Sequence, residues 1–304
     1  MSNPALNDKV FQKETLANEP ASFTPGWGSP AQEVPPNLFG GQAGSTPPGY
    51  GYAPGGTGGP TPPPPTAAST PETMRMSGTM SAAAVLLLLL MTTAAFSWNA
   101  VTTVTTTNID GTKNVAITTP PWVFASWIVG FGLAILTIFK PKLARVTAPL
   151  YALAEGVLLG AVSKMFNAYF PGIVVQAVML TFGVFVMMLV LYATGTVKVT
   201  DRLRTGIIAA TGAVCLVYLV SILASLFGAS IPMIHDAGPV GIGFSLLVVG
   251  IAAMNLLLDF DFIQRAVAYK APRYMEWFGA FGLMITLVWL YLELLRLLAK
   301  LRSR

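Results

Sequence analysis

Asn255-Leu-Leu-Leu-Asp-Phe-Asp-Phe262 stands near the end of a long apolar run and carries two carboxylates, Asp259 and Asp261. An acid in or at the edge of a bilayer costs about 2.5–3.5 kcal/mol on insertion scales. Only 10% of the residues are charged, and most of them lie between the apolar runs. We therefore expect this pair of acids to serve a function.

Apolar runs of the same kind recur along the chain. The hydrophobic fraction is 54% and the mean hydropathy is +0.64, whereas a soluble domain is about 45–50% apolar with about 25% charged residues. Each run is long enough to cross about 30 Å of hydrocarbon, and the absence of an alternating pattern favours helices over a barrel. The sequence predicts an all-α membrane protein, a bundle of seven transmembrane helices at about 80–101, 122–139, 148–170, 173–194, 206–227, 239–260 and 277–298.

The first 75 residues differ in composition. Gly and Pro dominate residues 35–65, and such a segment cannot bury enough apolar area to offset its chain entropy. We predict a disordered Pro/Gly-rich cytosolic tail over 1–75, serving as a tether or as a ligand for a partner, and a seven-helix transmembrane domain over 76–304. No charged segment followed by an apolar one opens the chain, so we expect no cleaved signal peptide.

The distribution of basic residues predicts the orientation. The connections after the second, fourth and sixth spans are basic and the alternate ones are nearly free of basic residues, which places the amino terminus in the cytoplasm. An odd number of crossings then sends the basic carboxyl terminus outside. Either the earlier loops fix the topology or the last segment dips in and returns; its length favours a full crossing. The basic residues concerned are Lys140, Lys142, Arg145, Lys198, Arg202, Arg204, Arg265, Lys270 and Arg273 inside, and Arg296, Lys300, Arg302 and Arg304 outside.

Several classes of function are disfavoured. The lone Cys215 and lone His235 exclude an intrachain disulfide and the usual Cys/His zinc cluster. No Ser/His/Asp set, HExxH motif or phosphate-binding loop is present. The net charge of +5 follows from the basic connections and gives no reason to expect a nucleic-acid partner. We expect a non-enzymatic protein without a cofactor, in contact with the lipid bilayer.

Because a helix rises about 1.5 Å per residue, the position of a residue in its span gives its depth in the membrane, and polar residues of similar depth can be grouped. Glu155, Asp259, Asp261 and Glu276 fall in the inner half of the membrane, and Lys164 falls in the outer half. Asp259 and Asp261 are about 200° apart on a helix, so one faces the bundle while the other reaches water or a base such as Arg265; alternatively, both mark the helix end. Glu293 and Arg296, one turn apart near the far end, can pair locally.

Glu155 lies among small residues at every fourth position, Ala152, Gly156 and Gly160. This spacing is typical of a close helix–helix contact. The acid is then either part of a titrating site or a protonated Glu hydrogen-bonded between helices. Carboxylates that gather in a poorly solvated place share protons, and their oxygens suit Ca²⁺. We predict a pH-sensing cation site of Glu155, Asp259 and Asp261, with calcium as a candidate ion and Glu276, Lys164 and Arg265 as secondary candidates.

Three stretches resemble the Bax inhibitor-1/YccA family, in its bacterial branch with a long Pro/Gly-rich amino tail. They are 149–163 (PLYALAEGVLLGAVS), 257–264 (LLDFDFIQ) and 290–298 (LYLELLRLL). The resemblance covers about residues 76–302. It implies a central helix surrounded by the others, a multi-pass protein of the bacterial plasma membrane, pH-sensitive calcium leak, and in YccA-type members modulation of a membrane protease.

The resemblance also implies a pH sensor of two aspartates. The first corresponds to Asp259 or Asp261, whereas the position of the second falls near Thr286, where this chain has no acid; we include Thr286 among the secondary candidates. Glu155 is a candidate for the missing carboxylate. Two functions follow: a pH-sensitive cation (calcium) leak channel or exchanger, and alternatively a non-conducting regulator that binds a membrane protease or another membrane protein.

Overall fold

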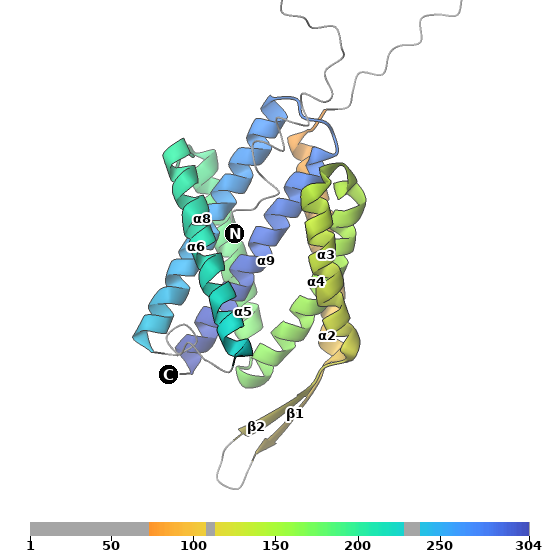
Figure 1. The fold of residues 1–304 in the computed structure, drawn as a ribbon, viewed down its shortest axis with the longest axis vertical. Helices are drawn as coiled ribbons and strands as arrows, with labels where there is room; N and C mark the ends of the chain where they lie inside the picture. The colour runs from red at the N-terminus through yellow and green to blue at the C-terminus, as the bar shows by residue number, and fades with distance from the viewer. Residues whose placement is uncertain (1–72, 108–112, 228–237, 304) are drawn as a thin grey trace, which may run out of the picture. The chain divides into compact units, whose positions relative to one another are not determined.

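The computed structural model describes residues 73–107, 113–227 and 238–303. Within them, seven helices are long and apolar enough to cross a membrane, which confirms the predicted bundle (Figure 1). The predicted tail, apart from residues 73–75, and His235 lie outside the described residues. The helices are α2 (Met76–Ala100), α3 (Pro121–Phe139), α4 (Ala144–Tyr169), α5 (Ile173–Ala193), α6 (Asp201–Leu226), α8 (Pro239–Ala268) and α9 (Met275–Arg302), with a 3-10 turn η2 (Pro141–Leu143) before α4.

Several helices extend further toward one end than the sequence predicted, and α6 and α8 do so by the most. α6 begins at Asp201 rather than at 206, and α8 continues to Ala268 rather than ending at 260. The predicted spans stopped where charges begin, but a helix continues through charged residues when these find partners. The connections α3–α4, α5–α6 and α8–α9 lie at this end, which we name the inner end.

A two-stranded sheet joins α2 to α3 and was not predicted. The strands β1 (Thr102–Thr107) and β2 (Lys113–Thr118) are antiparallel, with Thr102 opposite Thr118. β1 (TTVTTT) consists of Thr and Val, and half of β2 (KNVAIT) is Val, Ile and Thr; these residues suit extended backbone because they are branched at Cβ. The sequence therefore carried a hairpin signal, but the segment was too short and polar to be counted with the spans.

The central element is α9, which contacts α2, α4, α5 and α8. Phe278, Phe281, Leu290 and Leu295 on this helix are all fully buried. Phe281 packs edge-on against Tyr151 of α4, with the ring centroids 5.1 Å apart. The arrangement agrees with the central helix that the family resemblance implied.

The last helix crosses the bundle completely. α9 runs unbroken, and at its far end Arg302 donates from Nη1 to the Pro171 carbonyl at 2.8 Å and from Nη2 to Gln176 Oε1 at 2.9 Å. Pro171 belongs to the α4–α5 connection, at the opposite end from the α8–α9 connection. The alternative in which this segment dips in and returns is therefore wrong.

α2 and α4 lie unusually close together, as the small-residue spacing predicted. A Cβ added to Gly156 would overlap Thr93 Oγ1 and the Leu90 carbonyl oxygen, and one added to Gly160 would overlap the Ala94 carbonyl oxygen. Ala152 is also fully buried. The two backbones therefore meet along a strip that only very small residues can occupy.

Gly160→Ala should lower the melting temperature of the detergent-solubilised protein, because its methyl group would push α2 away from α4. Overpacking of this kind costs about 1–3 kcal/mol. Gly183→Ala on α5 is the matched control, since a Cβ there meets nothing within 4 Å. Equal melting temperatures for the two variants would contradict the close contact.

Candidate functional site: a polar column between α6, α8 and α9

Polar residues seven apart lie on one face of α6 and of α9. On α6 they are Arg204, Thr211 and Tyr218, and on α9 they are Thr286, Glu293 and Lys300. Seven residues make almost two turns, so each set forms a stripe of about 21 Å along its helix. α8 contacts both helices and supplies partners for each stripe. We call these residues with their α8 partners the polar column.

Asp259 lies in the middle of the column. Its side chain is 1% exposed, and its carboxyl group is in hydrogen-bond contact with Thr286 of α9. The second carboxyl oxygen, Oδ2, is buried and has no hydrogen-bond partner among the described residues. An orphaned oxygen of this kind is costly unless it carries a proton or meets a cation.

Asp261 points to the other side of α8. Its Oδ2 lies 2.7 Å from Arg204 Nη2 of α6 and 2.7 Å from Arg265 Nη2, one turn along α8. The 200° separation thus directs one aspartate into the bundle and the other to Arg265. Because α8 continues to Ala268, the alternative that both acids mark the helix end is wrong. We call Arg204, Asp261 and Arg265 the inner layer.

A neutral contact stands between Asp259 and the outer half of the column. Asn255 Nδ2 donates to Thr211 Oγ1 at 2.8 Å and to the Ile251 carbonyl at 2.9 Å. Asn255 is 4% exposed and Thr211 is fully buried. This bond ties α6 to α8 in the apolar interior, where it has little competition from water.

The outer half of the column holds a second charged group. Glu293 is 2% exposed; its Oε1 accepts from the Tyr218 hydroxyl at 2.9 Å and from Arg296 Nη1 at 3.0 Å. The Arg296 guanidinium also lies 4.9 Å from the Tyr218 ring centroid. The predicted Glu293–Arg296 pair is therefore confirmed, whereas its partner on α6 was not foreseen.

Lys300 adds a further buried cation one turn beyond Arg296. Its Nζ donates to the Gly241 carbonyl at 3.0 Å and to Ser245 Oγ at 2.9 Å, both on α8. We call Tyr218, Glu293, Arg296 and Lys300 the outer layer. It joins α6, α8 and α9 near the end opposite the inner layer.

The predicted three-carboxylate cluster does not form. Glu155 bonds to Tyr151 on its own helix, and its Oε2 lies 3.8 Å from the position of a Cβ on Gly130 of α3. Within the described residues, no group of three or more acidic, His or Cys side chains is arranged to hold a metal ion. Glu155 and Asp259 both lie about 15 Å from the inner helix ends. They are therefore at the same depth, but Glu155 faces α3 and Asp259 faces α9. The structure therefore does not bring Glu155, Asp259 and Asp261 together as a set of calcium ligands.

The remaining candidates lie elsewhere. Glu276, at the start of α9, is 6% exposed; it accepts from the Arg75 backbone N–H at 2.9 Å and lies 3.8 Å from Arg273 Nε. Lys164 belongs to α4, and its Nζ lies 5.0 Å from the ring centroid of Trp98 on α2. Neither is part of the polar column. The seven-residue spacing on α6 and α9 was the sequence signal that would have revealed Arg204, Tyr218 and Lys300.

Arg296→Gln should destabilise the protein more than Glu293→Gln, because it leaves Glu293 buried without its cation. We expect a loss of about 1–3 kcal/mol, toward the lower end because the Arg296 side chain is 39% exposed and solvent screens it. The double variant should recover part of the loss. Thermal unfolding of all four proteins gives the coupling; strictly additive losses would show that the two residues act independently.

Comparison with known proteins supplies a family. The family model described as Bax inhibitor 1 like matches residues 3–303, almost the whole chain. Comparison with curated proteins and with solved structures returned no match.

Proposed function

Since the chain belongs to the Bax inhibitor 1 like family, we propose that it is a pH-sensitive cation leak channel or exchanger that passes calcium across the cell membrane. Its amino terminus faces the cytoplasm, so the inner end is the cytosolic one. The observation that carries the proposal is the buried Asp259, whose Oδ2 lacks a hydrogen-bond partner among the described residues. An ionisable side chain at this depth is a functional-site hypothesis by default.

Asp259 is the acid that meets the ion. It lies between two layers that each contain cationic side chains, and it is accompanied by Thr286 and the Asn255–Thr211 contact. Such oxygen-bearing groups can replace part of a cation's hydration shell. Protonation of Asp259 removes its charge, so a proton and a cation compete for the same carboxyl group. The calcium ion is cargo here, held by one carboxylate rather than by a permanent set of ligands.

The inner layer acts as the gate that closes the ion path at the inner end. Asp261 holds Arg204 on α6 and Arg265 on α8, so its negative charge keeps the two helices together at this end. When Asp261 is protonated, the two arginines lose their common partner and repel each other. Loss of the Asp261 charge therefore opens the inner end, whereas protonation of Asp259 removes the carboxylate that meets the ion, so the two acids act on the leak in opposite directions.

The two aspartates should respond in opposite ways when proteoliposomes with an internal calcium-sensitive dye are assayed across pH. Asp261→Asn imitates the protonated inner layer and should raise calcium entry at neutral pH by about tenfold, since bonds between charged groups contribute about 1.5–3 kcal/mol. Asp259→Asn removes the acid that meets the ion and should lower entry at every pH.

Two variants serve as controls. Asp201→Asn neutralises an exposed aspartate at the start of α6 and should leave the flux unchanged. Glu155→Gln should also leave the pH profile unchanged, because Glu155 faces α3. No calcium movement by the natural protein at any pH would remove the proposal. If Glu155→Gln flattens the pH profile and the two aspartate variants do not, the pH response depends on Glu155 of α4 instead.

One observation favours the regulatory function as a second candidate. The chain just before α2 is fixed to the α8–α9 connection: the Met74 N–H donates to the Ala271 carbonyl at 2.7 Å, and Thr73 forms a β-bridge with Pro272. A partner that binds the preceding segment, such as a membrane protease, therefore acts on the chain next to the two helices of the column.

Deletion of residues 1–72 separates the two functions, because it keeps this attachment intact. If the protein regulates a partner through the tail, activity in cells should be lost while flux in liposomes stays the same. Full activity in cells after the deletion would exclude a regulatory function of the tail. Expression should be matched by blotting against a carboxyl-terminal tag.

A further inference from the structure

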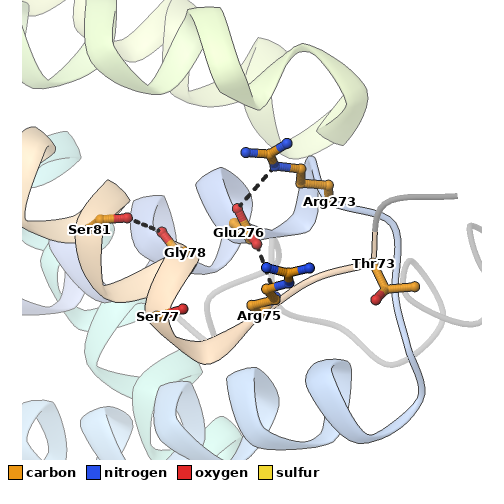
Figure 2. Close-up of a pocket in the computed structure, with 7 residues that line it drawn as sticks. All are labelled: Thr73, Arg75, Ser77, Gly78, Ser81, Arg273 and Glu276. Carbon is orange, nitrogen blue, oxygen red and sulfur yellow. Dashed lines mark hydrogen bonds and ion pairs between the residues drawn. The ribbon is translucent and has the colours of Figure 1, made fainter. Parts of the chain in front are cut away.

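Two adjoining pockets lie at the inner end, where α2, α4 and α9 begin. Their volumes are about 370 Å³ and about 350 Å³, and Gly78, Ser81, Arg273 and Glu276 line both. The first also includes Arg75 and Ser77, and the second Arg145. Figure 2 shows Arg75 and Arg273 on either side of Glu276. The site is separate from the polar column.

Three arginines from different parts of the chain line this double pocket: Arg75 the first pocket, Arg145 the second, and Arg273 both. Arg75 precedes α2, Arg145 lies in the first turn of α4, and Arg273 lies in the α8–α9 connection. All three residues are exposed. The one carboxylate in the lining is Glu276, so the site keeps a positive excess that favours an anion.

The position of Glu276 leaves the arginines accessible from the pocket. Its carboxyl group is pressed against the first turn of α2, where a Cβ on Gly78 would overlap it, and it accepts from the Arg75 backbone N–H. The acid thus forms part of the wall, and its buried side chain is only 8% exposed against 55% for that of Arg273. The guanidinium is the group that a ligand reaches.

Polar groups of α2 complete the anion-binding surface. Ser77 and Ser81 line the first pocket beside the helix N-terminus; the Ser81 hydroxyl donates to the Gly78 carbonyl at 2.9 Å, so Ser77 is the hydroxyl-bearing residue that we assign to the ligand. Arg75, the N-cap residue, makes no side-chain cap hydrogen bond. The positive end of the α2 dipole already faces the Glu276 carboxylate, so the arginines supply the charge that attracts a ligand. Phosphate oxygens suit this combination, because arginine binds them through parallel hydrogen bonds.

The second pocket continues onto an apolar surface. Its lining includes Ala82 and Val85 of α2 together with Tyr274 and Trp277 at the start of α9. Val85 is 45% exposed and lies within the candidate membrane span Met76–Ala100. Tyr and Trp are typical of the membrane–water boundary. A ligand that fills both pockets therefore has an anionic part and an apolar part.

We propose that this double pocket binds the headgroup of an anionic phospholipid. The phosphate lies beside Arg273, which lines both pockets, with Arg75 on the side of the first pocket and Arg145 on the side of the second. An acyl chain follows Val85 along α2 into the bilayer. Basic pockets between transmembrane helices on the cytoplasmic side bind such headgroups in other membrane proteins. A free phosphate would use the same arginines but would gain nothing from the apolar wall, which is why we assign the site to a lipid.

Native mass spectrometry of the full chain in detergent tests the assignment, with phosphatidylglycerol and phosphatidylcholine added in parallel. The natural protein should retain phosphatidylglycerol preferentially. Arg145→Gln/Arg273→Gln should weaken its binding by about 30-fold, because each basic residue near an anionic lipid contributes about 1 kcal/mol. Lys198→Gln/Arg202→Gln is the matched control: it removes two exposed charges at the same end, outside the pockets.

A variant of opposite sign distinguishes charge from general damage. Glu276→Gln keeps an acceptor for the Arg75 N–H but removes the repelling charge, so it should tighten phosphatidylglycerol binding. Equal retention of the two lipids, or equal losses in the pocket and control variants, would overturn the proposal. Displacement of phosphatidylglycerol by millimolar inorganic phosphate would also overturn it and assign the site to a small anion. None of these results depends on calcium flux.

Discussion

A charge in the apolar interior must have a partner, and this constraint organises α6, α8 and α9. Asp261 is held by Arg204 and Arg265, and Glu293 by Tyr218 and Arg296. In both layers the partners come from two helices. An ion pair inside a bilayer gains little over an apolar contact, but removing one partner is expensive because it strands the other. The charges therefore fix which helices stay together more than they add to stability.

Asp259 is the one acid of the polar column, among the described residues, that has no cationic partner. The other acids of the column have cationic partners, whereas Asp259 faces Thr286 and keeps Oδ2 without a bond among the described residues. The family resemblance places a second aspartate near Thr286. A threonine can bond to a carboxyl group but cannot share a proton with it as a second acid does. In this chain the middle of the column therefore contains one acid, while the other aspartate of α8, Asp261, lies in the inner layer.

The sequence predicts depth better than it predicts direction. Apolar length located the seven spans, and helix geometry separated Asp259 from Asp261, because both follow from spacing along one helix. The proposed contact between Glu155 and Asp259 failed since equal depth says nothing about which faces of two helices meet. Helix ends were misplaced at Arg204 and Arg265 because hydropathy stops at a charge, whereas the backbone continues when that charge is paired. The buried position of Lys300 depends on the Gly241 carbonyl and Ser245, and no local pattern around Lys300 predicts them.

The basic end of α9 shows how pairing changes a topological rule. The positive-inside rule concerns cations that must cross during insertion, yet Arg296, Lys300 and Arg302 stand at the end opposite the basic connections. Each is bonded: Arg296 to Glu293, Lys300 to α8, and Arg302 to Pro171 and Gln176. These hydrogen bonds and ion pairs thus offset the free-energy cost of placing the three cations at this end. The start of the same helix lies among the arginines of the double pocket. One buried helix therefore runs from the double pocket past Thr286 to the outer layer.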